Sequence, residues 1–439
     1  MLNCSRNGNV EKPKESIEIE LLPQKKSLND HQSFGHQLLS VMHFIFGQHL
    51  QVPPMDRSLG AFWNIIFAFH SFAVFAVAFF CTASSFMAFK RSFSNFGIAM
   101  FIGAGFLGSL ECLLRIVYTV MRKSKIETIA AKVHFTLYHE NLETDPLPFV
   151  NRLSRVITVM ALTAVIVFII CLTTGYLSIF WETTTILDKL LQNNTAIDAD
   201  QMIRESDYSV EIIQSWAYIW QVFYIWPSVL MVRILTGIVH YFSFFAIGRV
   251  MISDFLFYTW YSTIIHQYRQ LAKVLPKVMD GRAGKEKLQE WNKCHHNLNE
   301  LLKEVNSLTS PVIVYAVIST GLQIGIMSFT ILNLYTESNA FAFTVYAISS
   351  MQQIVIYCVL GQKIKDSVNN LSAEAYKGSW MDDTGENKKQ IALMVMASSD
   401  KNGNCLPGTP FFSMSLEFLA SMASAVFTYF IVLIQLNKN

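Results

Sequence analysis

The sequence predicts an all-α, polytopic membrane protein that crosses the bilayer with seven helices. Of its 439 residues, 52% are hydrophobic and only 15% are charged, whereas soluble domains carry about 25% charged residues. The apolar residues come in long blocks of roughly 20 or more, which is the length that spans a bilayer core of about 30 Å. The net charge of +2 is too small to indicate a nucleic-acid partner.

Seven apolar blocks are expected to form the membrane spans. They cover residues 61–86, 96–120, 156–181, 216–247, 312–334, 341–360 and 409–436. Pro227 interrupts the fourth block, which we expect to continue as a helix past Arg249, and Pro311 precedes the fifth. The last block opens with Thr409 and Pro410, which are typical of the cap and the first position of a helix.

The distribution of positive charge predicts the orientation of these spans. Most of the 34 Lys and Arg residues fall in the N-terminal arm and in alternate loops, and such residues are retained on the cytoplasmic side. We therefore expect a cytoplasmic N-terminus and an extracellular C-terminus, which is the opposite of a G-protein-coupled receptor. The acidic loop 182–215 then lies outside, and Asn193 within it begins a glycosylation sequon.

This topology divides the chain into six parts. They are a cytoplasmic arm (1–58), the first four spans (59–250), cytoplasmic helices (251–310), spans five and six (311–361), a cytoplasmic segment (362–408), and the last helix with an extracellular tail (409–439). Apolar residues at helical spacing, among them Tyr268 and Trp291, predict two long cytoplasmic helices joined by a turn near Gly281. A further short helix is expected at 388–399.

The sequence carries no pattern typical of an enzyme or a metal site. Its seven cysteines have no CxxC spacing, so neither a disulfide framework nor a zinc site is predicted. The adjacent His295 and His296 point about 100° apart on a helix and do not suit one shared metal ion. Neither H-E-x-x-H nor G-x-S-x-G occurs in a span. We expect no enzyme, no cofactor and no metal.

Glu111 and Arg115 are charged residues inside the second block. They lie one turn apart and can pair with each other. The pair is interpreted either as a structural ion pair or as part of a link that couples helix movements.

One face of the last block is small and mildly polar. Residues at steps of three and four share this face, and they are Ser421, Ala425, Thr428, Val432 and Leu436. Such a stripe suits either a pore lining or close packing inside a single helix bundle, and its periodicity leaves both interpretations open. Glu417, near the start of the helix, would either concentrate cations or be an acid stabilised by the helix dipole.

Two stretches resemble the insect odorant receptors. TYFIVLIQL at 428–436, preceded by PFFSMSLEFLAS, closely resembles the C-terminus of the odorant-receptor co-receptor, with Leu419 where that pattern has Phe. YCVLGQKIKDSVNNLSAEAYKGSW at 357–380 is similar to the pattern of odorant receptors in general. The resemblance extends from about residue 250 to the C-terminus, and earlier residues match only in layout.

One difference from the co-receptor is informative. The turn between the fourth and fifth spans is short here, as in ligand-binding odorant receptors, whereas the co-receptor carries a long insertion. A tail like the co-receptor's on such a body resembles early-branching odorant receptors, which form channels without a co-receptor.

The resemblance implies a tetrameric, odorant-gated, non-selective cation channel in the plasma membrane of sensory neurons. Its central pore would be lined by the last helix, with the gate at Val432 and further pore residues Leu436, Gln435, Thr428 and Glu417. A ring of four valines makes a dry constriction that ions cross poorly until it widens. The implied partners are a small volatile ligand, permeating cations, membrane lipid, and either identical subunits or a co-receptor.

The resemblance also implies a ligand pocket in the outer half of each subunit. Such pockets are mostly apolar, with aromatic walls and few polar groups. The candidate residues are Met100, Phe101, Ala104, Thr174, Gly175, Ile179, Trp220, Phe223, Tyr224, Phe343 and Tyr346. Gly175 would leave space and Tyr346 would donate one hydrogen bond, although each of these positions also fits ordinary packing between helices.

Three other identities remain open at this point. Gustatory receptors share a T-Y-x-x-x-x-x-Q-F ending, but Leu436 stands here in place of the final Phe. Interpretation of the chain as a co-receptor itself is also open. A secondary transporter, from a different class, is expected to show internal repeats and broken helices, whereas only Pro227 breaks a span here and no repeat is evident.

Overall fold

The structure is a computed structural model, and it describes residues 61–91, 96–139, 147–171, 229–279, 284–333, 337–377, 389, 395, 407–409 and 412–437. Eight helices occur in these ranges, namely α3 (Ala61–Arg91), α4 (Phe96–Met121), α5 (Lys123–His139), α6 (Leu147–Cys171), α10 (Val229–Met279), α11 (Gly284–Asn333), α12 (Glu337–Lys377) and α14 (Leu416–Asn437). Two short strands, β1 (Pro407–Thr409) and β2 (Phe412–Ser413), pair antiparallel. The predicted arm (1–58), the loop 182–215 and most of the helix expected at 388–399 lie outside the described residues.

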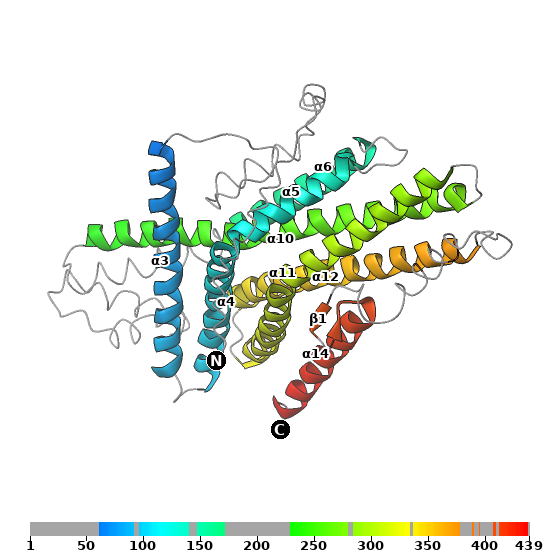
Figure 1. The fold of residues 1–439 in the computed structure, drawn as a ribbon. Coiled ribbons are helices and arrows are strands. Elements are labelled where there is room, and N and C mark those ends of the chain that lie inside the picture. Colours follow the sequence, from blue (N-terminus) through cyan, green and yellow to red (C-terminus); the bar gives the residue numbers. More distant parts are fainter. Residues whose placement is uncertain are drawn as a thin grey trace, which may run out of the picture.

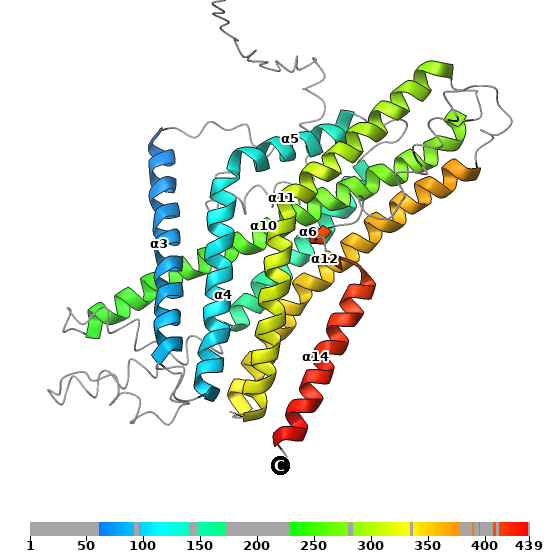
Figure 2. The same cartoon turned by 60° about the horizontal axis from the view of Figure 1, so that its bottom comes forward.

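Three long helices join predicted membrane spans to predicted cytoplasmic helices without interruption. α10 continues past Arg249 to Met279, as the sequence predicts, and α12 runs on from the sixth block to Lys377. α11 contains both the second long helix and the fifth block, and it changes direction along its course (Figure 2). Pro311 lies near its middle, and a proline inside a helix removes one backbone hydrogen bond and favours a kink.

Two elements between the second and third blocks differ from the prediction. α6 begins at Leu147 rather than at residue 156, because Leu153 and Ile157 belong to one apolar face that packs on Ile252 and Phe255 of α10. α5 has no counterpart among the predicted elements. Its buried residues Ile126, Ile129, Ala130 and Val133 recur at helical spacing, a signal that the lysines around them obscured.

The last helix begins later than its opening sequence suggests. The backbone of Thr409 is paired with Phe412 in the β1–β2 hairpin, so Thr409 does not cap the helix as expected. Ser415 takes that role, because its Oγ accepts a hydrogen bond of 3.2 Å from the backbone N–H of Phe418. α14 therefore starts at Leu416, and Glu417 lies in its first turn, where an acid interacts favourably with the helix dipole.

Several helices have the length and surface of membrane helices. Among the described residues, three stretches are long and apolar enough to cross a bilayer, Ala68–Met87, Gly103–Met121 and one within Glu286–Phe329, and Leu416–Val432 is a shorter apolar stretch. Large apolar side chains such as Phe69, Phe72 and Val159 are exposed. Such an exposed apolar surface is unfavourable in water and suits contact with lipid.

The largest core lies at the other end of the long helices. We call this region the long-helix bundle: residues 251–279 of α10, 284–310 of α11 and 357–377 of α12, with α5 packed against them. These helices run side by side away from α3 and α4 in both views (Figures 1 and 2). Trp291 is fully buried at its centre, and its indole N–H donates to the Leu271 carbonyl oxygen at 3.1 Å.

Candidate functional site

α14 lies at the edge of the molecule, where it contacts α11 and α12 (Figures 1 and 2). One face of the helix is packed against the rest of the chain: Phe418, Leu419 and Met422 contact the core of the long-helix bundle. Val426 and Phe430 follow at steps of four and are half-buried. This spacing places all of the packed residues on one side of the helix.

The predicted stripe of α14 lies on an adjoining face of the helix and is exposed. Ser421, Ala425, Thr428 and Val432 are all exposed, with 45% of Val432 accessible, and so are Glu417 and Gln435. Leu436 belongs to the helix, but its side chain is not among those described. The alternative that this stripe packs inside the chain's own helix bundle is therefore wrong.

The exposed stripe is made of small side chains whose hydroxyl groups are bonded within the helix. The hydroxyl of Ser421 donates to the Glu417 carbonyl oxygen at 3.0 Å, and that of Thr428 donates to the Ser424 carbonyl oxygen at 2.9 Å. Because their protons are bound within the helix, these groups present small surfaces that let other helices approach closely.

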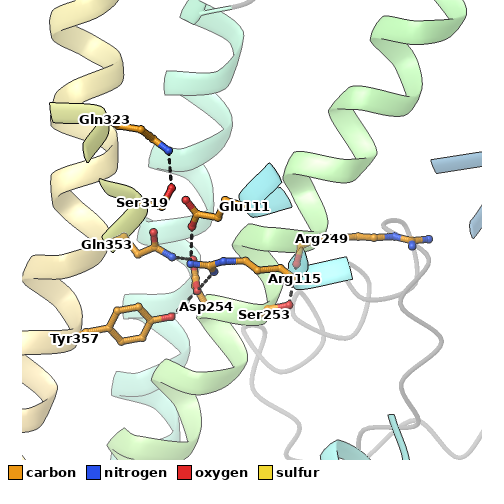
Figure 3. Close-up of polar contacts among 9 residues, drawn as sticks. All are labelled: Glu111, Arg115, Arg249, Ser253, Asp254, Ser319, Gln323, Gln353 and Tyr357. Carbon is orange, nitrogen blue, oxygen red and sulfur yellow. Dashed lines mark hydrogen bonds and ion pairs between the residues drawn. The ribbon is translucent and has the colours of Figure 1, made fainter. Parts of the chain in front are cut away.

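A second polar feature joins α4, α10 and α12 around one carboxylate (Figure 3). Asp254 of α10 accepts hydrogen bonds from three side chains. Arg115 Nη1 donates to Oδ1 at 2.7 Å, Gln353 Nε2 donates to Oδ2 at 2.6 Å, and the Tyr357 hydroxyl also donates to Oδ1. We call these four residues, with Glu111, the polar junction.

Glu111 is the second acid of the polar junction. Its Oε1 lies 2.8 Å from Arg115 Nη2, which confirms the predicted pairing of these two residues. Arg115 is only 3% exposed, and a buried guanidinium requires an ionic partner because desolvation strongly disfavours an isolated charge. Arg115 has two such partners, on its own helix and on α10.

The sequence did not predict the contribution of Asp254, Gln353 and Tyr357. Asp254 follows Arg115 by 139 positions, and Gln353 and Tyr357 follow Asp254 by 99 and 103. Only tertiary packing brings such distant residues together. One signal was available, since Asp254 is a lone acid in the apolar run VMISDFLFYTWY, and an acid in such a run is expected to have a partner.

The predicted pocket residues are only partly described by the structure. Met100 is half-buried and Ala104 is fully buried on α4, one turn apart. Phe101 on α4, and Phe343 and Tyr346 on α12, belong to helices whose side chains are not described at these positions. The remaining candidates lie outside the described residues, and they are Thr174, Gly175, Ile179, Trp220, Phe223 and Tyr224.

An open depression of about 600 Å³ lies at the start of α6. Its lining residues are Pro148, Asn151, Arg152, Arg155 and Val156. Both arginines are exposed. Met100 and Ala104, the predicted pocket residues whose side chains the structure describes, are not among its lining residues.

His295 of the long-helix bundle is a packed residue. Its ring stacks on Trp291 with centroids 5.3 Å apart, and its Nε2 lies 3.2 Å from Asn299 Nδ2. Burial, together with a smaller effect of the neighbouring His296, lowers the pKa of His295 to about 4. Among the described residues no group of three His, Cys, Asp or Glu side chains is placed to hold a metal ion.

Comparison with known proteins identifies what the chain is similar to. Residues 99–427 match the profile of the family described as 7tm Odorant receptor. The odorant receptor coreceptors of Anopheles gambiae and Drosophila melanogaster are 21% and 22% identical to this chain over 152 residues, which is 34% of its length. The matched region spans 31% of the length of these relatives.

The fold is similar to that of a solved olfactory receptor. The insect olfactory receptor OR5 from Machilis hrabei superposes with a TM-score of 0.60 and 16% sequence identity, over 91% of this chain and 97% of that one. The same receptor in complex with eugenol gives a TM-score of 0.60 with 15% identity, over 91% and 98% of the two chains. At this level of identity the likeness concerns the fold.

Proposed function

The chain belongs to the insect odorant receptor family, a family of membrane proteins, and we propose that it is a subunit of an odorant-gated, non-selective cation channel of the plasma membrane. The observation that carries this proposal is the exposed stripe of α14. The exposed surface of α14 combines this stripe of small and hydroxyl-bearing side chains with larger apolar ones, Phe427, Tyr429 and Ile431. The stripe itself is suited to surround water together with other copies.

In the proposed channel, four copies of α14 surround one axis and Val432 forms the gate. Its isopropyl groups make a ring that water leaves readily, so ions lose their hydration there and stop. Thr428 lies one turn before this ring, and Gln435 and Leu436 lie beyond it towards the outer mouth. A glutamine amide replaces part of an ion's hydration without strong preference among cations, and Glu417 at the other end attracts cations electrostatically.

The proposed topology has seven spans, a cytoplasmic N-terminus and an extracellular C-terminus. The long-helix bundle then projects into the cytoplasm, where its helices join neighbouring subunits. The distribution of Lys and Arg supports this orientation. On this topology Asn193 faces outward and is available for glycosylation.

A small volatile molecule is the proposed ligand. The eugenol complex of the Machilis hrabei receptor, with a similar fold, supports a ligand of this class. The proposed pocket lies among the candidate residues on the second, third, fourth and sixth spans, with Tyr346 as a hydrogen-bond donor. Tyr346→Ala is expected to change the ranking of odorants, and an unchanged ranking would remove this residue from the pocket.

The proposed function is tested by expressing the chain alone in a cell without odorant receptors and recording whole-cell current with an odorant panel. Odorant-evoked cation current from the chain alone supports a homotetramer. Current only when a co-receptor is co-expressed supports a heterotetramer. Uptake of a substrate without current would overturn the channel proposal in favour of a transporter.

Two related identities receive less support. Co-receptors carry a long insertion between the fourth and fifth spans, whereas here α10 ends at Met279 and α11 begins at Gly284. The match of residues 99–427 to the odorant receptor profile favours an odorant receptor over a gustatory one. A response to volatile ligands in the recording above, with none to sugars and bitter compounds, would separate these last two.

A further inference from the structure

The chain leading into α14 lies directly against the backbone of α12. Gly361 of α12 is buried, and a Cβ built on it would lie 2.0 Å from the Met414 carbonyl oxygen and 3.0 Å from the Met414 carbonyl carbon. No side chain fits there, because carbon atoms do not approach a carbonyl oxygen so closely without repulsion. At Gly321 and Gly105, in contrast, an added Cβ meets nothing within 4 Å.

Met414 also fixes the first turn of α14. Its side chain is 1% exposed and belongs to the core of the long-helix bundle. The next residue, Ser415, is buried and caps α14 through the hydrogen bond from the Phe418 N–H. The start of the helix is thus held between α12 and its own cap, whereas the stripe that runs on from Ser421 to Val432 is exposed.

Gly361 follows the polar junction along one face of α12. Gln353, Tyr357 and Gly361 are spaced four residues apart, so they lie one above another. Gln353 and Tyr357 bind Asp254 of α10, and Arg115 of α4 binds the same carboxylate. One rigid stretch of α12 therefore connects the helices that carry the proposed ligand pocket with the start of α14.

We propose that the contact between Gly361 and Met414 is the coupling point that makes α14 follow α12 when the channel opens. The proposal rests on the proposed channel function and adds a positioning residue to it. Because the two backbones touch, a displacement of α12 against α10 moves the start of α14 directly. A side chain at position 361 would separate the two backbones and leave odorant binding in place.

The test compares Gly361→Ala with Gly321→Ala, two substitutions that each add one methyl group inside a long helix. Odorant-evoked current and surface expression are recorded together, and a co-receptor is co-expressed if wild type requires it. Ligand affinity is measured on purified protein. The ligand is eugenol if eugenol activates wild type, and otherwise the strongest activator of the panel. Gly361→Ala is expected to lower the maximal odorant-evoked current per surface channel at least threefold, with affinity within twofold of wild type. Gly321→Ala is expected to match wild type in both. Unchanged current in Gly361→Ala, or equal losses in the two variants, overturns the proposal.

Two further measurements test the proposal if Gly361→Ala does not reach the cell surface or if wild type passes no current. If Gly361→Ala does not reach the surface, Ser415→Ala replaces it, because loss of the cap loosens the same start of α14 from the other side. The same loss of current at unchanged affinity is expected, and wild-type current would overturn the coupling point.

If wild type itself passes no current, the channel proposal fails independently. Amide hydrogen exchange over residues 415–419 then tests the contact alone, with faster exchange expected in Gly361→Ala than in Gly321→Ala and equal exchange overturning it.

Discussion

Arg115 of α4, which is buried, and Asp254 of α10, which is half-buried, form an ion pair at 2.7 Å although 139 positions separate them in the chain. Arg115 is also paired with Glu111 of its own helix, so one guanidinium is shared between two acids. The arrangement is asymmetric, because removal of the arginine leaves two acids facing each other, whereas removal of one acid leaves the arginine with a partner.

This asymmetry predicts unequal effects of two substitutions on stability. Arg115→Met is expected to lower the free energy of unfolding by about 3 kcal/mol, as for other buried pairs broken at one side. Asp254→Asn is expected to cost less, because Glu111 still neutralises Arg115. Thermal unfolding of the detergent-solubilised protein measures both. Asp366→Asn, at an exposed acid of α12 bonded to Gln362, is the control and is expected to stay within about 0.5 kcal/mol of wild type. Equal costs for Arg115→Met and Asp254→Asn would contradict the shared-partner arrangement.

The proposed gate predicts a difference between two valines of α14, exposed Val432 and half-buried Val426. Val432→Ser places a hydroxyl in the dry ring and is expected to raise the current without odorant several-fold, because water then remains in the constriction. Val426→Ser makes the same chemical change on the packed face and is expected to leave this basal current unchanged. Whole-cell current at equal surface expression measures both, and a similar rise for the two variants would rule out Val432 as the gate.

The burial of His295 predicts a loss of stability in mild acid. Its pKa is lowered to about 4 in the folded protein, against about 6.5 in an unfolded chain. Between these pH values the unfolded chain binds a proton at His295 that the folded protein does not. The free energy of unfolding is therefore unaffected by this group above about pH 6.5 and falls as the pH drops towards about 4.

Measuring the free energy of unfolding from about pH 7 to about pH 4.5 tests whether His295 causes this loss of stability. His295→Gln removes the titrating group and is expected to flatten the loss of stability that wild type shows in this range. His296→Gln, at the exposed neighbouring position, is the control and is expected to keep most of the loss. A wild-type profile in His295→Gln would assign the acid sensitivity to other groups.

The indole of Trp291 is predicted to stabilise the long-helix bundle mainly by its volume. Trp291→Phe removes the hydrogen bond to the Leu271 carbonyl oxygen and part of the ring, and it is expected to cost roughly 1–2 kcal/mol. Trp291→Ala leaves a cavity in a fully buried site and is expected to cost about 4 kcal/mol. Melting temperatures rank the two variants, with Tyr376→Phe at an exposed position of α12 as the control. Equal losses of stability in Trp291→Phe and Trp291→Ala would mean that the hydrogen bond contributes more than the volume of the ring.

Much of the architecture could be predicted from local patterns. The helices around the first, second, fifth and sixth apolar blocks, and the continuation of α10 past Arg249, follow from apolar length and helical periodicity. The pairing of Glu111 with Arg115 follows from their spacing alone. The start of α14 was mispredicted, because Thr409 and Ser415 both suit a helix cap and only the pairing of Thr409 with Phe412 excludes the first.

The sequence by itself determined that this chain is helical, has membrane-spanning blocks and resembles the odorant receptors, because these properties depend on residues that are neighbours in the chain. The tertiary structure decided which face of α14 is left exposed, which distant side chains meet at Asp254, and why position 361 has no side chain. Each of these depends on how helices far apart in sequence approach one another, and neither the period of a helix nor the type of a residue specifies its distant partner.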